Sequence, residues 1–453
     1  MPFSARSQPD RLGTPAPIRR PHSRRPSLRR GRSFPGTKLV FPPLVAGLVL
    51  LAALRTGSAE DWPCWRGPNH DGTSNEATAP VHWSDTENVA WKVAVPETGH
   101  ASPIVSRGVV YLVGTDETKQ NRMLLAFDRQ TGRRLWERVV LHAPLERKHR
   151  LNSWASSTPA TDGERIYVSF LDVDRMFVAA YDRQGNRLWA VHPGVFSSRH
   201  GYCSSPVLFE DLVIVNGDHD GDAYIVALDR STGAIRWKID RENKTRSYCT
   251  PLIRAIDGRP QMMLSGSKCI ASYDPRTGER LWIFDGPTDQ FVASLVYGNG
   301  LVFVTGGFPD KHILAIDPRG RGNITGSDYV KWRHYRNGVS YVPSPVAVGE
   351  WFFVVSDNGI GTCFEARSGR VLWQHRMGRR YSASLVACGG NVYFLDDDGI
   401  TKVVRAAPTY ELIAENPLNE ATYASIAVSD GQLFIRGERH LFCIGRPAAT
   451  ASR

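Results

Sequence analysis

Residues 125–136 read Leu-Ala-Phe-Asp-Arg-Gln-Thr-Gly-Arg-Arg-Leu-Trp: an apolar segment, an Asp-x-x-Thr-Gly turn and a second segment that carries Trp. An Asp at this position accepts hydrogen bonds from N–H groups two or three residues later, and Gly supplies the positive φ that closes the turn. The pattern therefore predicts a β-hairpin. A hairpin alone is not stable in water, so we expect the Trp to hold one unit against its neighbour through its large apolar face.

The same pattern returns along the chain, and internal repeats of this length decide the architecture. Five further copies place the Asp and the Trp at Asp182 and Trp189, Asp229 and Trp237, Asp274 and Trp282, Asp317 and Trp332 and, with Glu for Asp, at Glu365 and Trp373. The copy at 180–189 is shorter, and the copy at 315–332 is longer.

A second landmark counts the units. Eight strands are predicted to begin at a Ser or Thr followed by Pro or an aliphatic residue, at intervals of 40 to 56 residues. These landmark residues are Ser102, Thr158, Ser205, Thr250, Ser294, Ser344, Ser384 and Ser425. Four short strands in each such interval are typical of a β-propeller blade.

The two ends of the repeat region have complementary defects. Residues 82–95 match only the Trp-bearing strand, with Trp91, whereas residues 423–444 supply three strands and no Trp strand. Joining them completes one blade and removes exposed sheet edges. We predict an all-β fold, an eight-bladed β-propeller of four-stranded blades, closed by an N-terminal strand that completes the last blade. Seven blades with a decorating strand is the alternative.

The basic character of the chain is concentrated at its start. Of 56 Lys and Arg and 45 Asp and Glu, residues 1–59 hold eleven basic residues and one acidic residue, which leaves the remainder near neutral. An apolar run at 39–54 precedes Gly57 and Ala59, the small residues that signal peptidase requires, so we predict cleavage after Ala59. A transmembrane anchor is the alternative, but the run contains two Pro and is short for a span. The predicted parts are a targeting segment at 1–59, a lead-in at 60–81, the propeller at 82–446 and a tail at 447–453.

At this point the repeat, the Ser-Pro strand starts and the Asp-Gly turns at 220–221 and 398–399 resemble the pyrroloquinoline quinone (PQQ)-like propeller repeat over residues 82–446. The family includes quinoprotein alcohol dehydrogenases, BamB-type outer-membrane assembly lipoproteins and secreted propellers without known activity. The lead-in Asp-Trp-Pro-Cys-Trp-Arg-Gly-Pro-Asn at 61–69 resembles the opening of the secreted set of planctomycete-type bacteria. The resemblance specifies the fold better than the function.

The chain departs from what the dehydrogenases imply. Those enzymes hold the quinone against a disulfide between adjacent cysteines and bind Ca²⁺ through Glu, Asn and Asp, whereas none of the seven cysteines here is adjacent to another. We expect the cysteines to be small buried apolar residues. We expect no cofactor and no metal; PQQ with Ca²⁺ remains the alternative. The acidic runs at 218–222 and 396–398 fit turns of the repeat better than a calcium loop.

The residues that lead into the inner strands of a propeller ring the mouth of its channel. Aromatic and basic side chains gather at these positions, where they would form a binding site or, alternatively, a packed plug. The candidate ligand-binding residues are His100, Trp154, His200, Tyr202, Tyr248, Phe291, Arg336, Tyr341, Tyr381 and Tyr423. The His residues among them, with His149, could also act as acid or base. Loops at 147–150, 199–200, 244–246, 333–336 and 376–380 add positive charge that would attract anionic ligands, or is simply solvated.

We find no motif of nucleophilic, phosphate-binding or zinc chemistry. The leading hypothesis is an exported monomer, periplasmic or extracellular and without a membrane span after cleavage, that binds a protein or an acidic polymer without catalysis. Nucleic acid is excluded as a partner because the basic residues form no continuous tract in an exported protein. The alternatives are an enzyme, either a quinoprotein oxidoreductase or a lyase or hydrolase that uses the mouth, and a BamB-like assembly factor. The absence of a lipobox Cys after the apolar run counts against a lipoprotein.

Overall fold

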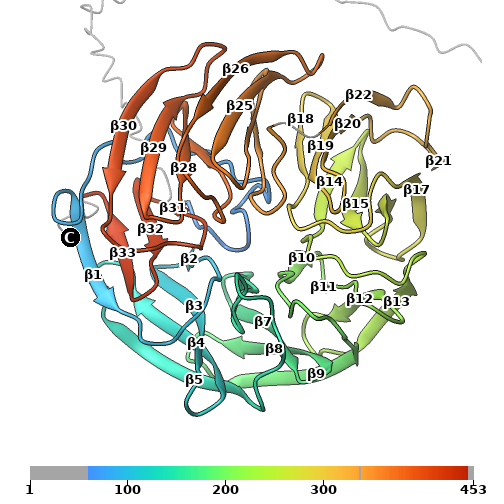
Figure 1. Cartoon of the computed structure of the whole chain (residues 1–453). Coiled ribbons are helices and arrows are strands. Elements are labelled where there is room, and N and C mark those ends of the chain that lie inside the picture. The colour runs from blue at the N-terminus through green and yellow to red at the C-terminus, as the bar shows by residue number, and fades with distance from the viewer. Residues whose placement is uncertain (1–59, 336–337, 447–453) are drawn as a thin grey trace, which may run out of the picture. The chain divides into compact units, whose positions relative to one another are not determined.

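The computed structural model describes residues 60–335 and 338–446. The predicted targeting segment and tail, and Arg336 of the candidate site, lie outside these residues. The described chain forms thirty-three strands in eight sheets, seven of them wholly antiparallel, and contains no helix that could cross a membrane. The predicted eight-bladed β-propeller is therefore confirmed, and the seven-bladed alternative is wrong. Figure 1 shows the blades set side by side in a ring.

Each blade runs from an inner strand at the channel to an outer strand at the rim. The first blade contains β2 (Ile104–Ser106), β3 (Val109–Asp116), β4 (Asn121–Asp128) and β5 (Arg134–His142). The next three are β6 (Ala160–Thr161), β7 (Arg165–Asp172), β8 (Arg175–Asp182), β9 (Arg187–Val195); β10 (Val207–Phe209), β11 (Leu212–Gly217), β12 (Tyr224–Asp229), β13 (Ile235–Asp240); and β14 (Leu252–Ile256), β15 (Arg259–Gly266), β16 (Cys269–Tyr273), β17 (Arg280–Asp285).

Blades five to seven repeat this order. Their strands are β18 (Val296–Gly298), β19 (Leu301–Gly306), β20 (His312–Ile316), β22 (Val330–Tyr335); β23 (Val346–Val348), β24 (Trp351–Val355), β25 (Ile360–Glu365), β26 (Val371–Arg376); and β27 (Val386–Cys388), β28 (Asn391–Leu395), β29 (Ile400–Arg405), β30 (Leu412–Pro417). The lengthened copy also contributes β21 (Gly322–Asn323), which adds a parallel fifth strand to the outer edge of blade four. One sheet therefore departs from the four strands predicted.

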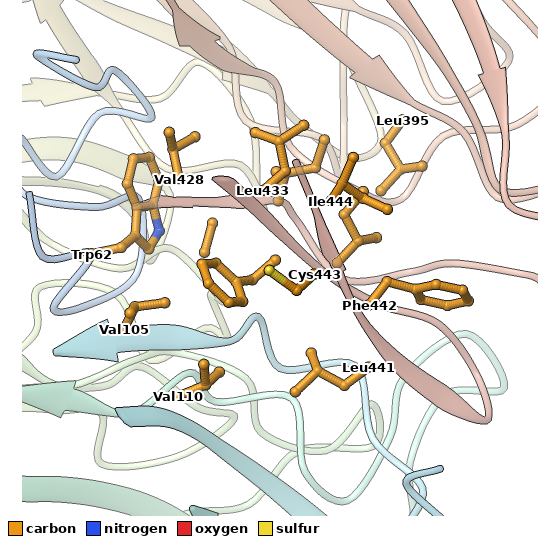
Figure 2. Close-up of a cluster of buried hydrophobic side chains, with 14 of the residues drawn as sticks. Trp62, Val105, Val110, Leu395, Val428, Leu433, Leu441, Phe442, Cys443 and Ile444 are labelled. Atoms are coloured by element: carbon orange, nitrogen blue, oxygen red, sulfur yellow. The ribbon is translucent and has the colours of Figure 1, made fainter. Parts of the chain in front are cut away.

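The last blade is closed by the N-terminal strand, as predicted. β31 (Ala427–Ser429), β32 (Gln432–Arg436) and β33 (His440–Ile444) are completed by β1 (Val89–Ala94), with Trp91 opposite Cys443. In Figure 1 the blue β1 lies beside the red β33. Figure 2 shows the buried cluster at this junction, where side chains of the lead-in and of the first, seventh and last blades pack together.

The recurring Trp explains why blades stay in register. In five blades a Trp of the outer strand donates its indole N–H to the carbonyl of the residue directly after the turn Asp or Glu of the next blade, and Trp91 does the same to Arg129 at 2.8 Å. In a sixth blade, Trp373 donates to Ala407, two residues after the equivalent Arg405. The turn Gly lies under this ring: a Cβ on Gly132 would stand 2.6 Å from Trp91. Asp128 accepts the N–H groups of Gln130 and Thr131 at 3.1 and 2.9 Å. The motif is therefore an interblade joint.

All seven cysteines are free thiols, and six of them are buried. They occupy positions of small apolar residues, as expected from the sequence.

Candidate functional site

The eight landmark residues form a closed ring of hydrogen bonds around the channel. The backbone N–H of each donates to the side-chain hydroxyl of the next, at N···O distances of 2.9–3.2 Å. The ring runs through Ser102, Thr158, Ser205, Thr250, Ser294, Ser344, Ser384 and Ser425 and back to Ser102. We call it the hydroxyl ring. Each blade contributes one buried N–H and one buried hydroxyl to the ring. The need to pair these buried groups explains why a Ser or Thr recurs at this position in every blade.

The channel holds a cavity of about 330 Å³. Its wall includes six hydroxyls of the ring and, nearer the mouth, aromatic and imidazole side chains: Trp65, His100, His149, His200, Tyr248, Tyr341 and Tyr423. A volume of this size lies at the lower end of the range for small-ligand pockets.

One end of the channel is covered by residues 60–76 of the lead-in, which we call the strap. Trp62 pairs with Val105 of blade one, and Thr73 pairs with Ala387 of blade seven. Between them, Asp71 forms an ion pair with Arg254 of blade four at 2.8 Å, so the strap crosses the end of the channel. The Trp65 indole N–H donates to the Ser294 hydroxyl at 3.3 Å and lines the cavity.

Buried polar contacts hold the strap in place. The Arg66 guanidinium donates to the carbonyls of Leu385 and Asp71 at 2.6 and 2.7 Å and also to that of Pro345. The Glu76 carboxylate accepts backbone N–H groups at the β31–β32 turn. The strap therefore forms a floor, and the cavity is reached from the other end, the mouth.

The structure separates the predicted site residues into two sets. His100, His200, Tyr248, Tyr341 and Tyr423 line the cavity. Trp154, Tyr202, Phe291 and Tyr381 do not: the last three are buried behind the wall, and Trp154 is half-buried against its own loop.

Specific contacts keep this second set out of the channel. The Tyr202 hydroxyl donates to Ser169 at 3.2 Å, the Trp154 indole donates to the Glu146 carbonyl at 2.7 Å, and Phe291 and Tyr381 are at most 2% exposed.

A simple register would have found three of the five lining residues, His100, Tyr248 and Tyr423, whereas Tyr341 and His200 line the cavity outside it. The residue two positions before each landmark lines the cavity in every blade: His100, Ser156, Cys203, Tyr248, Val292, Val342, Ser382 and Tyr423. Extended backbone turns successive side chains to opposite sides, so a position two residues from a lining residue lines as well. The sequence prediction accepted any aromatic within four residues of the landmark and therefore mixed both faces. It also missed Asn152, Gln290 and Asp357 of the wall.

Two partly buried imidazoles of the wall have pKa values shifted toward the neutral form. Burial, with the charges of Arg436 and Lys148, lowers the pKa of His100 to about 4, and its ring stacks on Tyr423 at 4.6 Å. Burial and nearby cations, Arg246 first among them, lower the pKa of His200. Since both shifts favour the neutral ring, neither imidazole brings a positive charge into the cavity.

The other reactive side chains of the wall are also neutral. Burial raises the pKa of the Tyr341 phenol to about 12 and that of the Cys203 thiol to about 12, and it raises the pKa of Tyr248 as well. The Tyr248 hydroxyl lies 3.0 Å from His200 Nδ1 and 3.0 Å from the Ser198 hydroxyl. None of the three side chains has a pKa lowered toward neutrality, which is one of the ways in which a protein activates a nucleophile.

The wall does not match the donors that a quinone with Ca²⁺ requires. Asp357 is the one carboxylate in the cavity, and its oxygens accept the N–H groups of Tyr341 and Val342 at 2.9 and 3.0 Å and face Lys311 at 3.3 Å. Across residues 60–335 and 338–446, no group of three His, Cys, Asp or Glu side chains is placed to hold a metal ion. Ca²⁺ takes six to eight oxygen ligands, and one carboxylate that is already engaged by two N–H groups and Lys311 does not supply them.

The acidic runs are structural. Asp396 accepts the N–H groups of Asp398 and Ile400 in a turn, at 3.1 and 2.8 Å. Asp218 is fully buried and pairs with Arg241 at 2.7 Å.

Some of the positive charge at the mouth is paired and some is not. Arg246 and Arg379 pair with Asp220 and Asp398 at 2.6 and 3.1 Å, which offsets part of the basic character predicted from sequence. Four cations on two adjoining loops have no carboxylate within ion-pair distance among the described residues: Arg147, Lys148, Arg150 and Arg199. We call these four the basic rim. Arg376, at the end of β26, and Arg380, in the loop that follows, have none either among the described residues.

Comparisons with known proteins agree with this architecture. A family model described as outer membrane protein assembly factor BamB matches residues 76–190, 145–262, 174–322 and 309–409. No curated protein matches the chain significantly in sequence.

Three solved structures illustrate the likeness in fold. BamB from Moraxella catarrhalis has a TM-score of 0.55 at 14% identity, covering 81% of this chain and 98% of that one. A europium-containing methanol dehydrogenase has a TM-score of 0.50 at 14% identity, covering 76% and 89% of the two chains. The quinohemoprotein alcohol dehydrogenase from Comamonas testosteroni has a TM-score of 0.50 at 13% identity, covering 86% and 82%. Assembly factors and dehydrogenases thus share this propeller, so fold alone does not separate the two roles.

Proposed function

The chain belongs to the PQQ-like propeller family described as outer membrane protein assembly factor BamB, and from this premise we propose that it is an exported, non-catalytic binding module that engages a partner protein at the channel mouth. It works outside the cytoplasm, in the periplasm or beyond, as a monomer. The targeting segment predicted at 1–59 supports export, with Glu60 as the first residue of the mature chain.

One observation carries this proposal: the channel is a blind cavity with a floor, a neutral wall and one open mouth. The floor is fixed by Arg66 and Trp65 of the strap. The wall imidazoles and phenols have pKa values shifted toward their neutral forms. Such a wall suits the burial of an uncharged part of a partner.

Site-specific photo-crosslinking in the producing cells tests the proposal. A photoreactive side chain replaces Leu151, which lines the cavity and is 41% exposed, and in a matched strain it replaces Ile235, which is 53% exposed on an outer strand. We expect the first position to give one discrete adduct, identified by mass spectrometry as the same protein in repeated experiments, and the second to give none. Equal adducts at both positions, or none at the mouth, would refute the proposal.

A role in outer-membrane protein assembly is the second candidate, and the family match favours it. It is a special case of partner binding. Affinity purification from detergent-solubilised membranes, with mass spectrometry, should then recover assembly proteins in proportion to the bait. Their absence would remove this role and leave the binding module.

If the protein is instead a quinoprotein enzyme, it must bind its cofactor and turn over a substrate. The processed protein would have to retain a quinone absorbance after desalting in PQQ with Ca²⁺, and it would have to oxidise an alcohol in a dye-linked assay. Turnover that is lost on substitution of His200 would overturn the non-catalytic assignment.

A further inference from the structure

We infer that the segment bound at the mouth is an acidic peptide that carries an aromatic side chain, with the aromatic side chain in the cavity and the flanking carboxylates on the basic rim. This rests on the proposed function and adds the chemistry of the partner. It depends on three features: the contacts that hold the two rim loops together, the lack of carboxylate partners for the rim cations, and the hydroxyl hydrogens in the cavity wall that have no acceptor among the described residues.

Two loops build the rim. They are the connection between β5 and β6, residues 143–159, and the connection between β9 and β10, residues 196–206. The His149 N–H and the Asn152 side-chain amide both donate to the His200 carbonyl, at 3.2 and 2.8 Å, and the His149 and His200 rings meet at 5.4 Å. These contacts fasten one loop to the other, so Arg147, Lys148 and Arg150 of the first loop join Arg199 of the second.

Two acids next to the rim loops already have partners: Glu146 lies in the first loop, and the Asp220 N–H donates to the Ser197 carbonyl of the second at 2.9 Å. Glu146 is bound to the fully buried Arg122, and Asp220 is bound to Arg246. Lys148 lies over the Trp154 ring at 4.4 Å, which orders it without neutralising it. Four adjacent cations with no carboxylate partner among the described residues attract a ligand of opposite charge.

The cavity opens beside this rim. Leu151 belongs to the same loop as Arg150 and also lines the cavity, so an apolar group can enter next to the positive charge. Tyr248 and Trp65 provide flat faces along the wall and at the floor. Flat faces and a narrow blind volume suit one aromatic ring, which buries a large area and has few torsions to immobilise.

The hydroxyl ring adds a preference at the inner end. Each of its oxygens accepts an N–H from the preceding blade, yet none of the eight donates its own hydrogen to a described residue within hydrogen-bond distance. All eight side chains are at least nine-tenths buried, and six line the cavity. An aromatic side chain with an oxygen at its tip, as in tyrosine, would accept these hydrogens.

An acidic polysaccharide meets only half of these demands. It could bind the rim, but it has no aromatic group for the cavity. A test that varies charge and anchor separately therefore distinguishes the two partners.

The experiment uses the full processed protein and fluorescence anisotropy with labelled, capped pentapeptides. The probe is Asp-Glu-Tyr-Glu-Asp, and the comparison peptides are Asp-Glu-Ala-Glu-Asp and Lys-Lys-Tyr-Lys-Lys. We expect the probe to bind about tenfold more tightly than the alanine peptide, because a buried aromatic group contributes 1.4 kcal/mol or more. The basic peptide should not bind, and binding of the probe should weaken with added salt.

Variants assign the binding to the mouth. The double variant Arg150→Glu with Arg199→Glu should weaken probe binding by about tenfold or more, since it reverses two rim charges. Val292→Phe, which fills the cavity, should remove the preference for tyrosine and leave the salt-dependent part. Arg133→Glu is the matched control: this arginine is also exposed but lies in the β4–β5 turn of blade one, outside the basic rim, so the substitution should not change binding. Circular dichroism confirms that all three fold.

Each remaining outcome decides between the alternatives. Equal binding of the tyrosine and alanine peptides, or tighter binding of polygalacturonate than of the probe, would overturn the aromatic anchor. Unchanged binding in the double variant would overturn the basic rim. If the peptides fail but crosslinking at Leu151 identifies a protein, partner binding stands and only the chemistry inferred here is wrong. If both fail, the proposed function fails with it.

Discussion

The two ends of the channel differ in how fully their polar groups are used. At the floor, Arg66 is 3% exposed and donates to three backbone carbonyls, and Trp62 is 2% exposed in the largest buried cluster. At the mouth, Arg150 and Arg199 are exposed and no described carboxylate pairs with them. At the floor, the polar groups of the strap find their hydrogen-bond partners within the propeller itself. At the mouth, charged and apolar side chains remain exposed and available to another molecule.

This contrast predicts its largest effect at the floor. Trp62→Ala should lower the free energy of unfolding by about 3–5 kcal/mol, as for other large buried aromatic side chains. Trp65→Ala is the matched control: that side chain is only part-buried and makes one hydrogen bond to Ser294, so we expect a loss of about 1 kcal/mol. Urea unfolding followed by tryptophan fluorescence measures both. Equal losses of unfolding free energy would mean that Trp62 does not anchor the strap more strongly than Trp65, which lines the cavity.

A smaller effect is expected midway along the channel, in the hydroxyl ring. Ser344→Ala leaves the buried N–H of Ser294 without its acceptor and should cost about 1–3 kcal/mol. Ser344→Thr keeps the hydroxyl, and Thr already occupies two ring positions, so it should restore most of the loss. Ser382→Ala changes a cavity residue outside the ring and serves as control. A loss in Ser344→Ala no larger than in this control would contradict the ring as a source of stability.

The fold could be predicted because its signals are local and repeated. The Asp128 turn, the Trp136 joint and the Ser102 landmark each recur at blade spacing, and together they give the number of blades and the closing strand. The hydroxyl ring could not be predicted in the same way, because each bond joins residues 40 or more positions apart. That pairing requires the blade-to-blade geometry as well as the spacing.

The site was predictable only in part for a different reason. Tyr248 and Tyr202 are both aromatic residues near a landmark, but one lies two positions before it and the other three, so they face opposite sides of the wall. The floor depends on Trp65, which packs against Ser294, more than two hundred residues later. Such a contact leaves no pattern in the sequence.

At the mouth, one buried acid should make stability depend on pH. Burial raises the pKa of Asp397 to about 6 from its ordinary value of 3.8, and its Oδ1 has no hydrogen-bond partner. The native state therefore keeps a proton that the unfolded state releases, and stability falls as pH rises from about 4 to 6. Asp397→Asn should remove this fall and gain about 1 kcal/mol at pH 8, with no gain at pH 4, after allowance for solvent screening. Urea midpoints at the two pH values measure it; a gain at pH 4 as large as at pH 8 would contradict the assignment.

The smallest expected change in stability is at Arg199, and it gives the sharpest test of the difference between the floor and the mouth. Arg199→Ala removes an exposed charge that no described carboxylate pairs with, so the free energy of unfolding should change by less than about 0.5 kcal/mol. The same substitution should nevertheless weaken binding of the acidic probe peptide, because the charge acts on the partner and not on the fold. Arg133→Ala, equally exposed but away from the mouth, should change neither quantity. A loss of stability in Arg199→Ala beyond that of Arg133→Ala would mean that the basic rim stabilises the propeller itself, and the distinction between a self-satisfied floor and an unsatisfied mouth would not hold.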